Sequence, residues 1–151
     1  MKAVIQRVLQ RAFVRVDNQE TGSIEKGLVI LLGIHSDDTI EDIKWLCNKI
    51  IGLRIFNDNN NVMNLSVSDM EGSLLIISQF TLYASTKKGN RPSYINAAKP
   101  ERAKVIYDQF INHIKSNYEI EVQEGVFGGD MKVSLVNDGP VTIIIDTKTK
   151  E

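Results

Sequence analysis

Two long apolar runs constrain the fold of this chain more than any other feature. GLVILLGIH at residues 27–35 and SLLIISQFTL at residues 73–82 contain no Asp, Glu, Lys or Arg. A strand with one solvated face alternates apolar and polar residues, whereas a strand buried on both faces is apolar throughout. Both runs therefore predict central strands of a sheet that is covered on its two sides.

Shorter segments predict further strands. Period-two alternation over residues 2–9 and 12–17 indicates two strands that are joined by a tight Gln10-Arg11 connection. Residues 119–127 predict another strand, which ends at the Gly128-Gly129 break.

The segment NDGPVT, residues 137–142, lies between two apolar runs that both predict buried strands, MKVSLV at 131–136 and VTIII at 141–145. Asp138-Gly139 is an ordinary signal for a hairpin turn. Pro140 does not fit a plain hairpin, because proline has no N–H to donate to a strand ladder. The turn is therefore either simple punctuation or shaped to present its backbone.

Two segments predict helices. Residues 37–52 combine an apolar stripe with Asp38 and Glu41 in the spacing of a capping box, and Gly52 is suited to the end of the helix. Pro100 is suited to the first turn of a second helix. The apolar stripe of the first helix is Ile40, Ile43, Cys47, Ile50 and Ile51, and that of the second is Ala103, Ile106, Tyr107, Phe110 and Ile114.

Length and composition indicate one domain over residues 1–151, with strands in the majority and two covering helices, which is an α/β or α+β class. The polar C-terminal tail, about 147–151, is expected to fray. The net charge of −1 gives no global footprint for nucleic acid, so RNA would need a local patch. A single cysteine, no signal-peptide pattern and no apolar run of ~18 residues favour a soluble, cytoplasmic protein without a membrane span.

Familiar catalytic and metal motifs are absent. His35 and His113 have no Cys, His or acidic neighbours at the spacing of metal ligands, and Cys47 lies on an apolar helix stripe, where it is typical of a small buried hydrophobe. No phosphate-binding or dinucleotide-binding glycine motif occurs. The sequence therefore predicts no metal and no cofactor.

Three stretches depart from the pattern of a plain sheet domain. The polar residues of SQFT, 78–81, either line a pocket at a strand end or bond to neighbouring backbone. FGGDM, 127–131, either cradles a ring or phosphate or is a strand break. KKGNRPSY, 87–94, carries cations and a tyrosine suited to a nucleic-acid backbone, although such clusters also occur in solvated loops.

Taken together and in this order, these segments resemble the D-aminoacyl-tRNA deacylase family over essentially the whole chain. The resemblance rests on MKAVIQRV, SQFTLYA, KKGNRPSY and GVFGGDMKVSLVNDGPVT. Gly129 departs from the alanine that is usual in the family. The resemblance implies a homodimer whose sheets form a barrel-like core under two main helices.

The resemblance also implies hydrolysis of the ester between a D-amino acid and the terminal adenosine of tRNA, with glycyl-tRNA(Ala) as a further substrate. Each subunit would insert a Gly-cis-Pro motif, Gly139-Pro140, into the active site of its partner. Its carbonyls would capture the substrate α-ammonium and exclude an L side chain. Arg7 would lie against this turn, although an exposed strand charge is the plain alternative, and Asn137 would contribute to the substrate site.

The sequence offers no convincing base to activate Thr81 as a nucleophile. The resemblance implies instead that catalysis is assisted by the substrate's own 2′-hydroxyl. The residues implied at the reacting ester are Ser78, Gln79, Phe80 and Thr81. Those implied at the adenine are Phe127, Gly128 and Met131, and those at the tRNA backbone are Lys87, Lys88 and Arg91.

Three other functions stay open at this point. A related deacylase with a trans Gly-Pro turn would accept L-alanine on the wrong tRNA. A non-catalytic, dimeric nucleic-acid-binding module would use the basic loop and the dimer surface. A metalloenzyme ranks third, given the poor set of metal ligands.

Overall fold

The computed structural model describes residues 1–151. The strands are β1 (Lys2–Val8), β2 (Ala12–Val16), β3 (Gln19–Ile24), β4 (Gly27–Gly33), β5 (Phe56–Asn57), β6 (Met63–Leu65), β7 (Ser73–Ser78), β8 (Val122–Glu124), β9 (Lys132–Ser134) and β10 (Thr142–Asp146). The helices are α1 (Ile40–Gly52) and α2 (Pro100–Asn117), and a short 3₁₀ helix, η1, spans Phe80–Tyr83.

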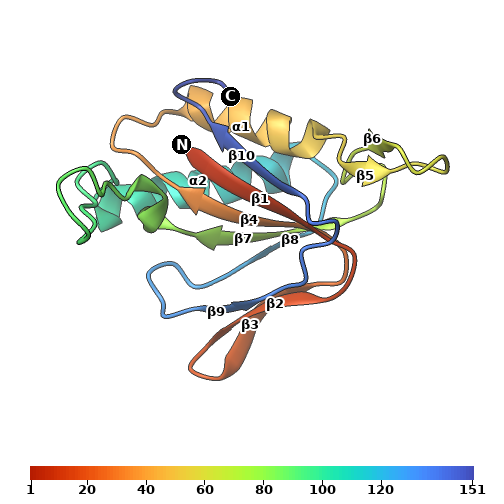
Figure 1. Ribbon diagram of the computed structural model, residues 1–151, viewed down its shortest axis with the longest axis horizontal. Coiled ribbons are helices and arrows are strands. Elements are labelled where there is room, and N and C mark those ends of the chain that lie inside the picture. The colour runs from red at the N-terminus through yellow and green to blue at the C-terminus, as the bar shows by residue number, and fades with distance from the viewer.

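The elements form three layers (Figure 1). Helices α1 and α2 cover one face of a five-stranded sheet of order β10-β1-β4-β7-β8, and a three-stranded sheet of order β3-β2-β9 lies against the other face. Strands β5 and β6 form a small separate hairpin. The predicted mixed α/β class with two helices is confirmed. The barrel-like core is not confirmed, because the strands are hydrogen-bonded into three separate sheets.

The two apolar runs form the centre of the larger sheet, as predicted. In β4, Ile30 packs in the core beneath the helices, whereas Val29 packs in the second core between the sheets. In β7, Ile76 and Leu75 divide in the same way. Successive side chains of a strand point to opposite faces. These runs have no polar face because each face meets a packed layer.

The parallel part of the sheet creates one edge suited to a ligand. Strand β4 runs parallel to β7, and β7 runs parallel to β8, whereas β1 and β10 are antiparallel to their neighbours. The carboxyl ends of the three parallel strands therefore lie at the same edge. Ligands of open α/β sheets bind in crevices outside such ends.

Both predicted helices are present, but the predicted cap of the first is wrong. Helix α1 is capped by Thr39 and Asp42, which form the capping box expected of Asp38 and Glu41. Asp38 is buried and used elsewhere, as described below. Ile40 is exposed, because it lies in the first turn and outside the buried stripe. Helix α2 begins at Pro100, and its predicted apolar face is buried.

The expectation of a hairpin around NDGPVT is also wrong. Strand β9 pairs with β2 in the three-stranded sheet, whereas β10 pairs with β1 in the five-stranded sheet. Residues 135–141 therefore cross from one sheet to the other. Both flanking strands are only partly buried in this chain, because each lies at the edge of its sheet.

Strand β7 ends earlier than predicted, at Ser78, and Phe80–Tyr83 form η1. The 3₁₀ turn packs closely on the end of β4 at Gly33, where an added Cβ would lie 3.1 Å from both the Gln79 carbonyl oxygen and Leu82 Cβ. Glycine permits this close approach. Strand β8 is likewise shorter than the predicted 119–127.

The C-terminal tail is bound to the domain, so the expectation that it frays is wrong for its first residues. Buried Thr147 accepts a hydrogen bond of 2.6 Å from the Met1 amino group, which also forms a 2.7 Å ion pair with Asp38. Lys148 lies 3.1 Å from Asp38 and 3.2 Å from Asp42. Burial raises the pKa of Asp42, but hydrogen bonds from Thr147, Thr39 and Lys148 outweigh it and hold this pKa well below its usual range.

Neither helix has the length and apolar character needed to cross a bilayer.

Candidate active site

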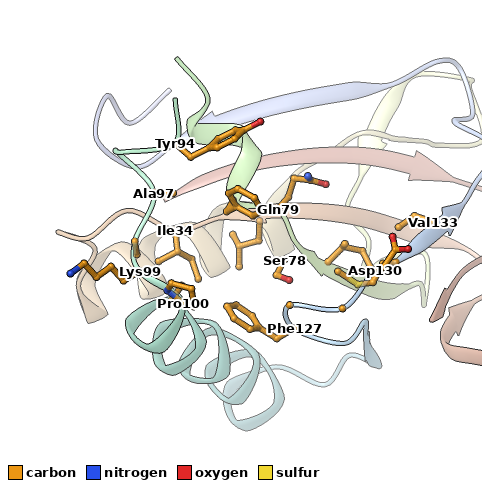
Figure 2. Close-up of a pocket in the computed structure, with 18 of the residues that line it drawn as sticks. Ile34, Ser78, Gln79, Tyr94, Ala97, Lys99, Pro100, Phe127, Asp130 and Val133 are labelled. Atoms are coloured by element: carbon orange, nitrogen blue, oxygen red, sulfur yellow. The ribbon is translucent and has the colours of Figure 1, made fainter. Parts of the chain in front are cut away.

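A cavity of about 760 Å³ opens at the carboxyl ends of the parallel strands. Its walls come from the ends of β4 and β7, from the segment that leads into α2, and from residues 127–131 after β8. Figure 2 shows Ser78 deep between these walls, with Tyr94 towards one end of the cavity and Asp130 towards the other. The cavity therefore lies where the topology leads us to expect a ligand.

Six of the predicted site residues meet in this cavity, although they come from two distant segments. These are Ser78, Gln79, Phe80, Phe127, Gly128 and Met131. Thr81 is adjacent but does not line the cavity, and its hydroxyl accepts a hydrogen bond from the Gln79 side-chain amide. The pocket interpretation of SQFT is therefore supported over the local alternative, except at Thr81.

The backbone of this turn carries free donors. Gln79 N–H donates to the Leu32 carbonyl at 2.8 Å, and the first bond of the 3₁₀ turn runs from Leu82 N–H to the Gln79 carbonyl at 3.3 Å. The amides between them, of Phe80 and Thr81, belong to the first turn, where N–H groups have no intrahelical acceptor. The Gln79 side chain does not cap them. Two adjacent donors are thus available beside Ser78.

Phe127 forms a fixed aromatic wall of the cavity. Its ring packs on that of Tyr107 with a centroid separation of 5.5 Å, and the Tyr107 hydroxyl donates to the Ile76 carbonyl at 2.9 Å. The following turn is closed by a 2.9 Å bond from Gly129 N–H to the Val126 carbonyl. The segment after β8 is thus held against α2 and β7.

Several cavity residues were not predicted individually as site residues. Tyr94 and Asp130 were singled out only as parts of KKGNRPSY and FGGDM, and Ile95, Lys99 and Pro100 were not predicted to belong to a site. Lys99 and Asp130 are the only charged residues that line the cavity. A possible signal was the position of Pro100 at the start of a helix that follows the end of β7. That signal identifies a helix start but not the strand edge at which it lies.

The Gly139-Pro140 turn lies apart from the cavity of its own chain. Asp138 N–H donates to the Arg7 carbonyl at 2.9 Å, and Arg7 pairs with Leu28 at the beginning of β4. Ser78 pairs with Leu32, near the other end of that strand. The segment joining β9 to β10 and the carboxyl end of β7 accordingly lie on opposite sides of the molecule in Figure 1. The Gly139-Pro140 peptide bond is cis.

Arg7 is buried and holds this turn in place through hydrogen bonds. It is only 5% exposed, so the alternative of an exposed strand charge is wrong. Its guanidinium donates to the Ile55 carbonyl at 2.6 Å and to the Asp138 carbonyl at 3.1 Å, and it lies 3.2 Å from Asp138 Oδ1. The five donors of arginine suit such multiple contacts. One carbonyl of the turn is therefore held in a fixed direction.

Asn137 closes the same turn rather than lining the cavity. Its side-chain oxygen accepts a 2.8 Å bond from Val141 N–H, and its side-chain nitrogen donates to Thr142 Oγ1 at 2.7 Å. The residues before and after the turn are thus hydrogen-bonded to each other. The exposed backbone between them, at Gly139 and Pro140, is available to another molecule.

The basic residues Lys87, Lys88 and Arg91 are exposed on the loop between η1 and α2 and do not line the cavity. Mutual backbone bonds of 2.8 and 2.9 Å between Ser85 and Ser93 close this loop beside the cavity mouth.

The remaining candidates for chemistry lie outside the site. Cys47 is fully buried, and burial raises the pKa of its thiol to about 12, so no thiolate nucleophile forms there near neutral pH. No group of three or more His, Cys, Asp or Glu side chains is arranged to hold a metal ion.

Comparison with known proteins decides the family. The model of the family described as D-Tyr-tRNA(Tyr) deacylase matches residues 4–146. The chain belongs to this family. The resemblance that the sequence motifs indicated is therefore confirmed.

Relatives of similar length support the assignment. The chain is 59% identical to a D-aminoacyl-tRNA deacylase of Flavobacterium psychrophilum over 151 residues, which is all of both chains. It is 60% identical over 148 residues to a protein of the same name from Fusobacterium nucleatum, covering 98% of this chain and 97% of the relative.

Two solved structures share the fold. A structure described as c-Myc DNA Unwinding Element Binding Protein has a TM-score of 0.91 and 38% identity, covering 97% of this chain and 98% of the other. A probable eukaryotic D-amino acid tRNA deacylase has a TM-score of 0.80, covering 96% and 98%, and its 17% identity supports the fold alone.

Proposed function

We propose that this protein hydrolyses the ester that joins a D-amino acid to the 3′-terminal adenosine of tRNA, and that it also accepts glycine on tRNA(Ala). The observation that carries the proposal is the cavity that joins the SQFT turn to Phe127, in a chain 59% identical to a D-aminoacyl-tRNA deacylase. The free amides of the turn suit an ester carbonyl that becomes an oxyanion. Parallel assays of D- and L-aminoacyl-tRNA test the proposal, as set out in the Discussion.

The proposed active unit is a homodimer in which the Gly139-Pro140 turn of one subunit enters the cavity of the other. Two features support this arrangement. The turn is braced by buried Arg7 and by Asn137, yet it lies at the far end of β4 from its own cavity. Exposed apolar side chains also lie near it in the sequence, at Val136 and at Ile144 on the edge strand β10.

Chiral selection would follow from main-chain atoms. The carbonyls of the turn would bind the α-ammonium of the substrate, with the Asp138 carbonyl oriented by Arg7. An L side chain would then overlap backbone that is fixed by several hydrogen bonds, whereas a D side chain would point away from it. Rejection of L needs no matched pocket for each D side chain, so many D-amino acids and glycine would be accepted.

Catalysis would depend on the backbone and on the substrate. The amides of Phe80 and Thr81 would stabilise the oxyanion, and one such donor contributes about 2.7–4 kcal/mol. Ser78 and Gln79 would position the ester and ribose, and the ribose 2′-hydroxyl would orient or activate water. Phe127, with Gly128 and Met131, would contact the adenine, since aromatic stacking contributes about 1–3 kcal/mol per base.

The proposed mechanism gives no catalytic role to the Thr81 hydroxyl and a catalytic role to the ribose 2′-hydroxyl of the substrate. Thr81→Ala is expected to retain activity within about tenfold of wild type, because the proposed mechanism uses only the main-chain N–H of Thr81, which alanine keeps, and its hydroxyl is bonded to the Gln79 side chain. A substrate that ends in 2′-deoxyadenosine is expected to react at least about 10²-fold more slowly, the lower range for losing a general acid–base group. Single-turnover deacylation measures both. Inactivity of a folded Thr81→Ala protein would indicate an acyl-enzyme, and normal turnover of the deoxy substrate would exclude the 2′-hydroxyl.

A second candidate function is nucleic-acid binding without catalysis. It is favoured by the DNA-binding name of the structure that is 38% identical, and by the exposed basic loop with Lys87, Lys88 and Arg91. Hydrolysis of any D-aminoacyl ester by the purified protein separates the two functions. Binding of tRNA without hydrolysis would favour the second.

A further inference from the structure

The mouth of the cavity carries apolar side chains that the proposed contacts to the ester and adenine do not use. Phe80 is 57% exposed, Tyr94 38% and Ile95 85%, and all three line the cavity. The rings of Phe80 and Tyr94 meet edge to face, with centroids 5.0 Å apart and planes at 75°. The pair therefore holds two rings in place without burying them.

The backbone fixes this cluster on both sides. Immediately before Tyr94, the bonds between Ser85 and Ser93 close the basic loop. Immediately after it, Ala97 N–H donates to the Tyr94 carbonyl at 3.0 Å, and Ala98 N–H donates to the Ile34 carbonyl at 2.9 Å. The second bond ties the segment to the end of β4. Tyr94 is thus an exposed ring on a well-anchored backbone.

The chain segment that carries the cluster contains charges of one sign only, and the one acidic residue that lines the cavity, Asp130, comes from another segment. No Asp or Glu occurs between Glu71 and Glu101, whereas this stretch contains four cations in a chain whose net charge is −1. The four are Lys87, Lys88, Arg91 and Lys99, and none forms an ion pair. Unpaired cations beside exposed rings are complementary to a polyanion that carries flat apolar groups.

We propose that Phe80 and Tyr94 bind the base of the nucleotide that precedes the terminal adenosine, as a second nucleotide subsite at the mouth of the cavity. Lys99 at the cavity edge faces the phosphate between the two nucleotides, and the basic loop faces the phosphates further along the strand. The subsite rests on the proposed function, because that function places the terminal adenosine in the cavity.

The chemistry favours a single-stranded nucleic acid end over a protein. A base stacks on an aromatic ring whatever its identity, and nearby cations follow the backbone. The subsite should therefore favour an added nucleotide with little preference among bases. A protein partner would need acidic residues to match the four cations.

The test compares two esters of the same D-amino acid, one on adenosine and one on the dinucleotide cytidylyl-adenosine. For wild type, kcat/KM should be about tenfold higher with the dinucleotide, which corresponds to about 1.4 kcal/mol. Tyr94→Ala should reduce this ratio to near one, whereas Tyr94→Phe should keep it. Val105→Ala, which removes an exposed apolar side chain on α2 outside the cavity, should also keep it.

The other outcomes are equally clear. Hydrolysis of both esters with an unchanged ratio in Tyr94→Ala would overturn the subsite and leave the proposed function standing. A change in the sedimentation mass of Tyr94→Ala, without a change in the ratio, would assign the surface to a subunit contact. If neither ester is hydrolysed, calorimetric binding of uncharged adenosine and cytidylyl-adenosine tests the subsite alone. Equal affinities of wild type for the two would then refute it.

Discussion

Gly139→Ala is expected to lower kcat/KM for a D-aminoacyl-tRNA by about 10²-fold while the domain stays folded, since a misplacement of about 1 Å costs this much. Gly139 has φ +124°, which L side chains rarely adopt. A Cβ there would lie 2.7 Å from Val141 Cγ2 and 3.0 Å from Arg7 Nη2. The new methyl group would therefore displace the turn or its brace, and with it the carbonyls proposed to bind the substrate.

The control for this substitution is Gly52→Ala. A Cβ on Gly52 has no neighbour within 4 Å, and Gly52 is the last residue of α1. We expect activity close to wild type for this variant. If Gly139→Ala also kept full activity and full rejection of L esters, the turn would not be part of the active site.

Asp38→Ala is expected to lower the free energy of unfolding by about 3–5 kcal/mol, the typical cost of removing one partner of a buried ion pair. The Asp38 side chain is completely buried. It accepts bonds of 2.7 Å from the Met1 amino group and 2.7 Å from His35 N–H, and it lies 3.1 Å from Lys148. Removal of the carboxylate would leave the Met1 ammonium buried without its counter-charge.

The neighbouring Asp37 provides a matched control, because its carboxylate is exposed. Its side chain is 80% exposed, accepts a 3.2 Å hydrogen bond from Ser36 Oγ and lies 3.8 Å from His35 Nδ1. Asp37→Ala should change stability by less than about 0.5 kcal/mol. Urea unfolding followed by circular dichroism measures both variants. Equal stability of the two would show that the ion pair at the amino terminus contributes nothing net.

The parts of the fold that were predictable are those governed by local pattern. The apolar runs at 27–35 and 73–82 identified the central strands, because burial on both faces leaves no polar period. Pro100 and the 3.6-residue spacing after it identified α2 and its buried face. The motif resemblance added the family, which the whole-length comparisons confirmed.

The errors concern choices that depend on residues far away in the sequence. Residues 137–142 have the local signals of a hairpin, yet β10 finds its partner in β1 and β9 finds its partner in β2. Asp38 has the spacing of a helix cap, but it is ion-paired with the amino group of Met1. Thr39 is the N-cap instead, with Asp42 as its partner in the capping box. In both cases the local propensities of the two alternatives are similar. The alternatives differ in free energy only through contacts that exist once the sheet has formed.

The site was predictable in part for the same reason. SQFT and FGGDM each had a plain alternative, and only the adjacency of β7 and β8 brings their side chains into one cavity. Tyr94 and Lys99 lie at the cavity because residues 97 and 98 are bonded to the chain just after β4. The sequence does not reveal this anchoring. The buried state of Arg7 likewise depends on Ile55 and Asp138, far from it in the chain.

The most direct test of the account is side-by-side deacylation of D-Tyr-tRNA and L-Tyr-tRNA by the purified wild-type protein, with Gly139→Ala in parallel. We predict rapid loss of the D ester only, and a loss of rate or of selectivity in the variant. Hydrolysis of neither ester by the folded wild-type protein would contradict the account and leave nucleic-acid binding as the remaining candidate.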